Sequence, residues 1–318
     1  AKTNPAIVPL SDFVRTRYPG WEQSMVWKAH FGQGGLADRK TEGWTVWAYI
    51  DPTTTATQMD AVDAAVDVWG VPYGATDAKI AEVVARGKPV MVWEVHRYSE
   101  IARLQGLGVQ GLMEAQWLYL NQPPDLAVDQ FASQISVPGT LGLTNYSPAT
   151  ALKYDGAGGA YLDNGAFSSA LMGAHRVPDP NTHTITYSLK WDTIPGSGQH
   201  SGVAFCKASD DRYQFSQPNP SGGYHTVVRA NGDLELFRHD PAVTAGVRLS
   251  GPLPTVAPVA GQPMAFEVEV TSTQVFFRRT DVGPFEVSST DTMYRGRYWH
   301  LSAGSATVRP TWSGISRA

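Results

Sequence analysis

The spacing of apolar residues changes once along this 318-residue chain, and the change restricts the folds that it can adopt. In the first third, short runs of β-branched and aromatic residues recur about every 20 residues, the length of one strand–loop–helix–loop unit. From about Thr182 onward, apolar and polar residues alternate with a period of two. The first pattern is typical of buried parallel strands separated by helices, and the second of antiparallel strands with one buried face.

The expected parallel strands lie at 25–27, 45–50, 66–71, 89–95 and 109–113. Between them, 77–86 places Ile80 and Val83 on one helical face, with Thr76 as the N-cap and Gly87 as the stop. A complete eight-stranded barrel needs about 250 residues, whereas roughly 120 are available here. The sequence therefore predicts part of a barrel, or a partial sheet completed by another chain, with a small doubly wound sheet as the alternative.

Residues 87–115, GKPVMVWEVHRYSEIARLQGLGVQGLMEA, resemble the end of a glycerophosphodiester phosphodiesterase barrel, and the resemblance extends over about 20–120. It implies a TIM-barrel-like sheet that begins partway through the family's barrel. The catalytic segments of the family are missing: no His-Arg-Gly occurs, and Glu94, His96 and Glu114 replace its late Thr, Asn and Thr. The resemblance therefore implies a fold without the family's acid/base set.

Polar residues follow the expected parallel strands, whose carboxyl ends would meet at one rim. Catalytic candidates there are Lys28, His30, Glu94 and His96. Asp51, Glu94 and Glu114 are candidates for holding Ca²⁺ or Mg²⁺, since hard cations prefer oxygen ligands. The alternative is that these residues are polar only because strands end at water. Trp27, Trp47 and Trp93 are expected in the core rather than in a sugar-stacking wall.

The second half predicts an antiparallel β-sandwich of the jelly-roll type, with a hairpin at Asn231-Gly232. Residues 201–240 resemble the laminin-G and concanavalin-like lectin sandwiches, with 293–301 as a closing strand. The resemblance implies glycan contacts, alternatively ordinary sheet packing, at a set of polar and aromatic residues. These candidates are Asp210, Asp211, Arg212, Tyr213, Tyr224, His225, Arg229, Arg295, Tyr298 and Trp299.

The predicted fold class is therefore α/β plus all-β, with domains at 1–120 and 166–318 joined by a linker or first strand at 121–165. The net charge of −4 argues against nucleic-acid binding by bulk electrostatics. No apolar run is long enough to insert into a membrane, one cysteine excludes an intrachain disulfide, and no signal peptide is visible.

Two functional hypotheses follow from the residues and the resemblances. The first is a binding protein for a cell-envelope glycan or glycerophosphate polymer, of the phage minor tail or secreted adhesin type. It would be extracellular or on a virion, would carry a non-catalytic phosphodiesterase-like domain, and would have as further partners a tail assembly or a chain completing the barrel. The alternative is a metal-dependent glycerophosphodiester or teichoic-acid phosphodiesterase, and a glycosidase is a third option.

Overall fold

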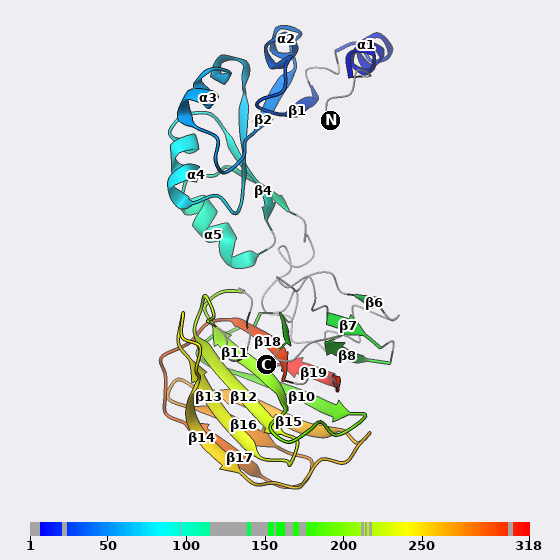
Figure 1. The fold of residues 1–318 in the computed structure, drawn as a ribbon, viewed down its shortest axis with the longest axis vertical. Helices are drawn as coiled ribbons and strands as arrows, with labels where there is room; N and C mark the ends of the chain where they lie inside the picture. Colours follow the sequence, from blue (N-terminus) through cyan, green and yellow to red (C-terminus); the bar gives the residue numbers. More distant parts are fainter. Residues whose placement is uncertain are drawn as a thin grey trace. The chain divides into compact units, whose positions relative to one another are not determined.

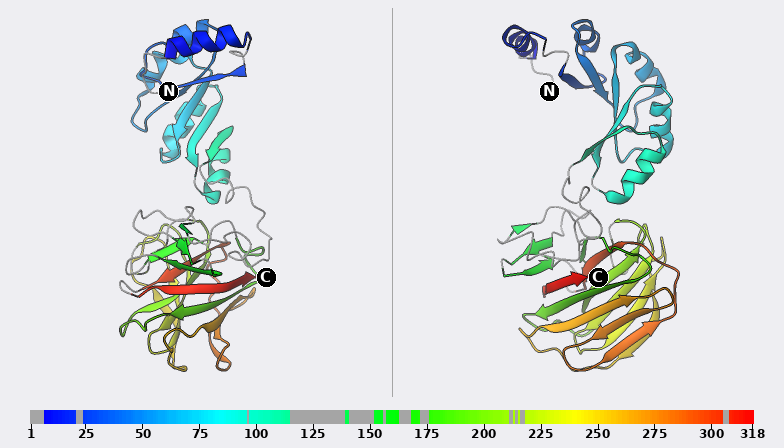
Figure 2. Two further views of the ribbon diagram at one scale, coloured as in Figure 1. Left: turned by 90° about the vertical axis from the view of Figure 1, so that its right-hand side faces the viewer. Right: turned by 180° about the vertical axis from the view of Figure 1, so that it is seen from behind.

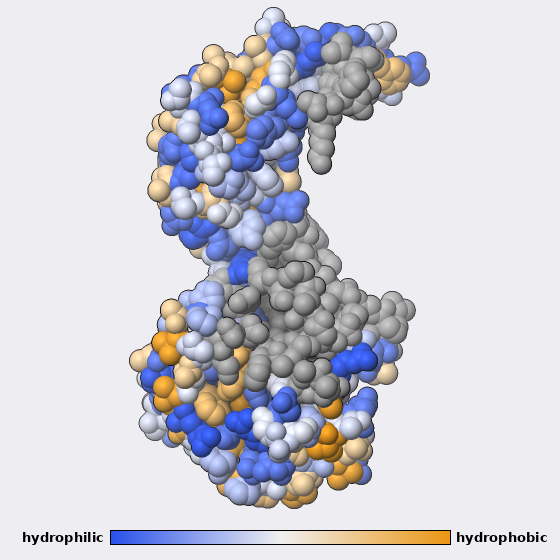
Figure 3. All heavy atoms as spheres, in the orientation of Figure 1, coloured by the Kyte–Doolittle hydropathy of each residue, from blue (hydrophilic) through white to orange (hydrophobic). Residues whose placement is uncertain are grey.

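The computed structural model divides the chain into two compact units, Ala1–Trp117 and Leu118–Ala318, here called the parallel-sheet unit and the sandwich unit. The structure describes residues 7–20, 24–95, 97–114, 139–140, 152–155, 157–162, 168–171, 176–210, 213, 215, 218–304 and 308–318. Figure 3 shows hydrophilic and hydrophobic residues interspersed over the visible surface of both units. No helix among the described residues is long and apolar enough to cross a membrane.

The parallel-sheet unit contains five strands that neighbour one another in sequence order, all of them parallel (Figure 1). The strands are β1 (Val26–His30), β2 (Thr45–Tyr49), β3 (Val68–Pro72), β4 (Val90–Val95) and β5 (Gly111–Glu114). The helical segments are α1 (Ile7–Arg17), α2 (Leu36–Thr41), α3 (Ala56–Asp60), η2 (Asp63–Ala65), α4 (Asp77–Val84) and α5 (Tyr98–Gly106). The predicted parallel sheet is thereby confirmed. Helices α3, α4 and α5 lie on one face of it, as Figure 2 shows from behind.

Helix α4 begins at Asp77, as the sequence predicts, and ends at Val84, two residues before the predicted end. Thr76 accepts a hydrogen bond from the backbone N–H of Lys79, as an N-cap should, and Ile80 and Val83 are fully buried. The spacing of three residues places these two side chains on the face that packs against the sheet. Helix α4 therefore packs on the sheet through Ile80 and Val83, the apolar residues that the sequence places on one face.

The tryptophans of the parallel-sheet unit are distributed differently from the prediction. Trp69 is fully buried, whereas Trp47 and Trp93 are only half-buried. Strand register explains the difference: Trp69 pairs with Ala48 and Val90 on the helix-covered face, while alternation turns Trp47 to the opposite face. Trp27 is also half-buried, so the expectation that Trp27, Trp47 and Trp93 form the core was wrong.

The sandwich unit consists of two antiparallel sheets (Figure 1). One has the order β17-β16-β15-β10-β19-β8-β7-β6 and the other the order β14-β13-β12-β11-β18-β9. The strands are β6 (Gly139–Thr140), β7 (Leu152–Tyr154), β8 (Gly159–Leu162), β9 (Ser168–Leu171), β10 (His183–Trp191), β11 (His200–Lys207), β12 (Gly223–Arg229), β13 (Leu234–His239), β14 (Val247–Leu253), β15 (Met264–Val270), β16 (Val275–Arg279), β17 (Phe285–Ser289), β18 (Tyr298–Ala303) and β19 (Pro310–Arg317). The predicted antiparallel sandwich is confirmed.

Alternation builds the core between these two sheets. Along β10 every second residue is buried, which places Ile185, Tyr187 and Leu189 in the core with Trp299 and Trp312. The hairpin expected at Asn231-Gly232 joins β12 to β13. There Gly232 adopts a φ of 94°, in the left-handed region that glycine tolerates.

Candidate functional site

His30 and Asp51, two of the candidates from the rim of the parallel sheet, contact each other. His30 ends β1, Asp51 follows β2, and the His30 Nε2–Asp51 Oδ2 distance is 3.0 Å. The backbone N–H of Gly32 donates to His30 Nδ1 at 3.2 Å. Nδ1 is therefore the acceptor and Nε2 carries the proton that it donates to Asp51. Both ring nitrogens are thus engaged within the fold.

Lys28, a third rim candidate, lies among aromatic rings. Its Nζ is 4.5 Å from the centre of the Trp47 ring, 5.8 Å from that of Tyr49 and 3.7 Å from Met113 Sδ. Burial lowers the pKa of Lys28, and the charge of Glu94 opposes that shift. The ammonium group is held by cation–π attraction on the half-buried face of the sheet.

The remaining rim candidates are only partly described. Glu94 is exposed at the end of β4, His96 lies outside the described residues, and of Glu114 only the backbone is described. Within the part of the chain that the structure describes, no three His, Cys, Asp or Glu side chains are placed to hold a metal ion. A Ca²⁺ or Mg²⁺ site at Asp51, Glu94 and Glu114 stays a prediction.

In the sandwich unit, several predicted glycan contacts are buried. Tyr224 and Trp299 point into the core between the sheets. Tyr213, His225 and Asp210 are buried as well, and Asp211 and Arg212 lie outside the described residues. At Tyr213, Tyr224, His225 and Trp299 the structure therefore favours sheet packing, the alternative that the sequence left open, over glycan contacts. The reason is that β11 and β12 are buried on both faces, so alternation alone does not identify an exposed side.

The outer face of the six-stranded sheet carries a histidine cluster, defined by His200, His225, His239 and His300. All four side chains are at most 1% exposed, and they come from β11, β12, β13 and β18. Two aromatic residues from the loop after β11 pack on them. The Tyr213 and His225 ring centres are 5.3 Å apart, and those of Phe215 and His200 are 4.6 Å apart.

Burial keeps three of these histidines, His200, His225 and His239, uncharged. It lowers the pKa of His200 to about 3 and that of His239 to about 4, and the pKa of His225 lies well below its usual value. Positive neighbours add to the effect, namely Arg229 beside His200 and Lys207 beside His239. Arg229, another predicted ligand contact, instead pairs with Glu235, with Nε 2.6 Å from Oε2. The cluster and its flanking arginine form a closed layer.

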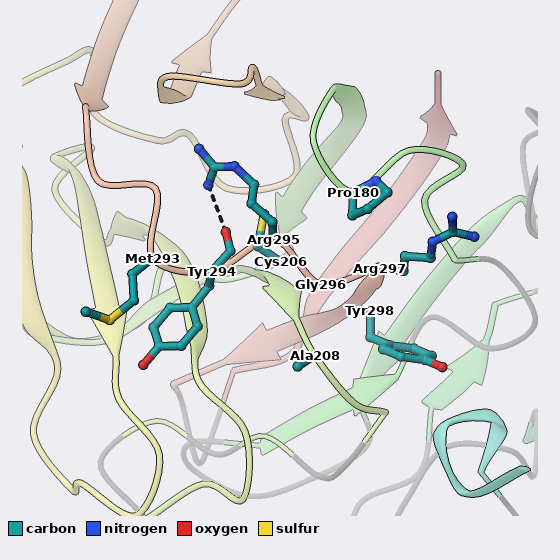
Figure 4. A pocket seen from close by; sticks show the side chains of 9 residues that line it. All are labelled: Pro180, Cys206, Ala208, Met293, Tyr294, Arg295, Gly296, Arg297 and Tyr298. Atoms are coloured by element: carbon teal, nitrogen blue, oxygen red, sulfur yellow. Dashed lines mark hydrogen bonds between the residues drawn. The ribbon is translucent and has the colours of Figure 1, made fainter. Parts of the chain in front are cut away.

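An accessible pocket lies elsewhere, where the segment before β18 crosses β11 (Figure 4). This arginine pocket has a volume of about 490 Å³ and is lined by Pro180, Cys206, Ala208, Met293, Tyr294, Arg295, Gly296, Arg297 and Tyr298. The predicted candidates Arg295 and Tyr298 belong to it. Met293 and Arg297 are exposed, and Tyr294 and Arg295 are half-buried, so a ligand can reach them.

The sequence interpretation missed Met293, Tyr294 and Arg297, because it assigned 293–301 to a strand. Strand β18 begins only at Tyr298, and the residues before it form a loop. The available signal was local: a Tyr-Arg-Gly-Arg-Tyr segment places two arginines and two tyrosines around one glycine. Gly296 is required there, since a Cβ would lie only 1.8 Å from the carbonyl oxygen of Lys207.

A hydrogen-bond network beneath the pocket fixes this loop. Tyr224 Oη donates to Asp291 Oδ1 at 2.7 Å, and Asp291 Oδ2 accepts from Arg238 at 2.7 Å. Tyr294 Oη donates to Asp240 Oδ1 at 2.8 Å, and Asp240 also pairs with Arg238. The backbone N–H of Tyr294 donates to Tyr224 Oη at 3.2 Å. The loop is therefore held at several points before any ligand arrives, which limits the ordering entropy that binding must overcome.

No family model and no curated protein sequence matches this chain. Among solved structures, the carbohydrate-binding module CBM66 from Bacillus subtilis is similar at 12% identity, over 58% of this chain and 96% of its own, with a TM-score of 0.33. The metal-free carbohydrate recognition domain of Emp46p is similar at 10% identity, over 61% of this chain and 98% of its own, with a TM-score of 0.42. The alginate lyase A1-II′ is similar at 16% identity, over 56% and 86%, with a TM-score of 0.35. At these low scores the function has to be argued from the residues of this chain.

Proposed function

We propose that the sandwich unit binds a glycan in the arginine pocket. The observation that carries the proposal is the lining itself: Arg295, Arg297 and the half-buried Tyr294 line an accessible pocket on a fixed loop. Tyr298, which is 7% exposed, also lines it. Guanidinium groups supply several hydrogen-bond donors, and tyrosine rings offer apolar faces with a polar edge. These are the groups by which proteins hold a sugar, whose ring has an apolar face and many hydroxyl groups.

The proposal has a direct test in the binding of the full chain to an array of cell-surface glycans. We expect Arg297→Ala to weaken binding to any glycan that the array identifies by about tenfold or more, the loss expected for one charge-assisted hydrogen bond. Arg248→Ala is the matched control. Arg248 is an exposed arginine on β14, it does not line the pocket, and Glu235 keeps Arg229 as a partner when it is removed. Equal loss in both variants would place the binding site elsewhere.

We propose further that the parallel-sheet unit is a partial barrel related to the phosphodiesterases and that it is not catalytic. Sequential strand order with helices on one face supports the first part. The engagement of both His30 nitrogens by Asp51 and the Gly32 N–H supports the second, because it leaves this histidine without a free acceptor for a substrate proton. The extracellular or virion setting, with an envelope glycan as ligand, belongs to the same proposal.

We therefore expect no turnover of glycerophosphocholine by the purified chain in the presence of Mg²⁺ or Ca²⁺. Phosphodiester hydrolysis needs an ion that neutralises phosphoryl charge and an acid/base pair within hydrogen-bond reach. The measurement is release of glycerol phosphate over time, with Glu94→Gln as the matched variant. Turnover that is abolished both by EDTA and by Glu94→Gln would contradict the non-catalytic assignment and favour a phosphodiesterase.

A further inference from the structure

Several arginines of the sandwich unit have carboxylate partners, but the two that line the pocket have none among the described residues. Arg229, Arg238, Arg278 and Arg279 all form ion pairs with Asp or Glu at 2.5 to 2.9 Å. Arg295 instead donates to two backbone carbonyls, those of Tyr294 at 2.8 Å and Thr271 at 3.2 Å. The exposed side chain of Arg297 forms no hydrogen bond or ion pair with any described residue. Within the part of the chain that the structure describes, no carboxylate pairs with either positive charge.

The lining does not offset this charge. Among the nine described residues that line the pocket, none is Asp or Glu.

The positive charge of Arg295 also acts on neighbouring groups. Burial raises the pKa of Cys206 to about 12, and the positive charge of Arg295 opposes that rise. Asp291 and Asp240, the two carboxylates that hold the Met293-Tyr294 loop, are occupied by Arg238 and by the two tyrosine hydroxyls. An anion in the pocket would therefore meet two guanidinium groups that no carboxylate of a described residue occupies.

The two guanidinium groups do not converge on one point. Gly296 separates the two arginines, and its backbone N–H donates to the carbonyl of Cys206 at 3.0 Å, which ties the loop to β11. From this anchor the side chains of Arg295 and Arg297 extend in different directions (Figure 4). Such an arrangement fits two separate anionic groups better than one anion held by both arginines.

From these observations we infer that the ligand of the pocket is an acidic polymer with anionic groups on successive units, one for each arginine. This inference rests on the proposed glycan binding and specifies its ligand class. A uronic-acid carboxylate and a sugar or glycerol phosphate share the required chemistry, because both accept hydrogen bonds from a guanidinium. Met293 and the tyrosine rings would contact the uncharged part of the chain.

The test measures calorimetric binding of the full chain to hexagalacturonate, to its fully methyl-esterified form, to monomeric galacturonate and to a glycerol phosphate hexamer. We expect the ester to bind about tenfold or more weakly than an acidic hexamer, and the affinity for that hexamer to fall with added salt. We also expect the monomer to bind far more weakly than the hexamer, because it can meet only one arginine. Preference for the glycerol phosphate hexamer over hexagalacturonate would support the inference and identify phosphate as the anion.

Variants separate the two arginines. Arg297→Ala and Arg295→Ala are each expected to weaken hexamer binding about tenfold, with Arg295→Lys restoring part of the loss because it retains the charge. An unchanged far-UV circular dichroism spectrum would exclude unfolding as the cause. Equal affinity for the acid and its ester, with glycan binding still lost in Arg297→Ala, would overturn the inference and leave the proposed function intact. No binding of these probes or of any array glycan would overturn both.

Discussion

Replacing Trp69 by alanine is expected to lower the free energy of unfolding of the parallel-sheet unit by about 3–5 kcal/mol. The side chain is fully buried on the helix-covered face of the sheet, and its Nε1 donates to Asp63 Oδ1 at 3.2 Å. Truncation would remove a large apolar surface from the core, leave a cavity and break a hydrogen bond. Hydrogen–deuterium exchange of the full chain measures the effect, because peptides from 45–95 report this unit separately from the sandwich.

Trp93→Ala is the matched control for this experiment. Trp93 lies on the opposite face of the same sheet and is only half-buried, in edge contact with Tyr49 at 5.9 Å between ring centres. Its truncation removes less buried surface and opens no enclosed cavity, so we expect a loss of about 1–2 kcal/mol. Equal losses in the two variants would contradict the assignment of the core to the helix-covered face.

Lowering the pH from 7 to about 4 is expected to destabilise the sandwich unit strongly, through its buried histidines. In the fold, burial holds the pKa of His239 near 4, whereas an unfolded chain has a histidine pKa near 6.5. Above pH 6.5 both states are neutral and no difference arises. Between pH 6.5 and pH 4 only the unfolded state binds the proton. The free energy of unfolding therefore decreases, as the pH is lowered, by about 1.4 kcal/mol per pH unit for each such histidine.

The size of this effect follows from the number of histidines with a lowered pKa. His183 behaves like His239, with its pKa lowered to about 4 by burial, and His200 is lowered further, to about 3. Each contributes ~3 kcal/mol by pH 4, which together is comparable to the whole stability of a typical domain. The groups facing the cluster are Arg229, Lys207 and Asp240.

Thermal unfolding between pH 7.5 and 4.5, followed by near-UV circular dichroism, tests the acid destabilisation. Because these histidines are protonated only in the unfolded state, we expect the melting temperature to fall steadily as the pH is lowered below 6.5. His239→Phe, which replaces a buried ring by an apolar one, should make that dependence less steep, because His183 and His200 still contribute. Lys190→Ala, at an exposed ion pair with Asp192, should leave it unchanged. A melting temperature that is constant down to pH 4.5 would show that these histidines are not buried in the neutral form.

The fold class could be predicted from the sequence, because it depends on the spacing of apolar residues along the chain. Continuous apolar runs separated by helices became the parallel sheet, and the alternation along 184–190 and 266–270 became strands of the sandwich. Which face of a strand is buried depends on strand register. The sequence could not show that Trp69 faces the helices while Trp47 and Trp93 face away.

The candidate site was harder to predict, since it depends on exposure and partners. The alternation of β12 does not reveal that the loop after β11 covers its outer face, and Tyr213 and His225 were therefore assigned to a binding surface. The sequence marks Arg295 as a candidate by its residue type alone. The sequence does not reveal that the nearby Asp291 pairs with Arg238, 53 residues earlier in the chain, and not with Arg295.

A crystal structure of the full chain with a bound acidic oligosaccharide would test the central claim most directly. Glycan binding by the arginine pocket predicts sugar density at the loop before β18, with one anionic group near Arg295, a second near Arg297, and hydroxyl groups on the tyrosine side. Sugar bound instead on the half-buried aromatic face of the parallel-sheet unit, beside Lys28 and Trp47, with the arginine pocket empty, would contradict it.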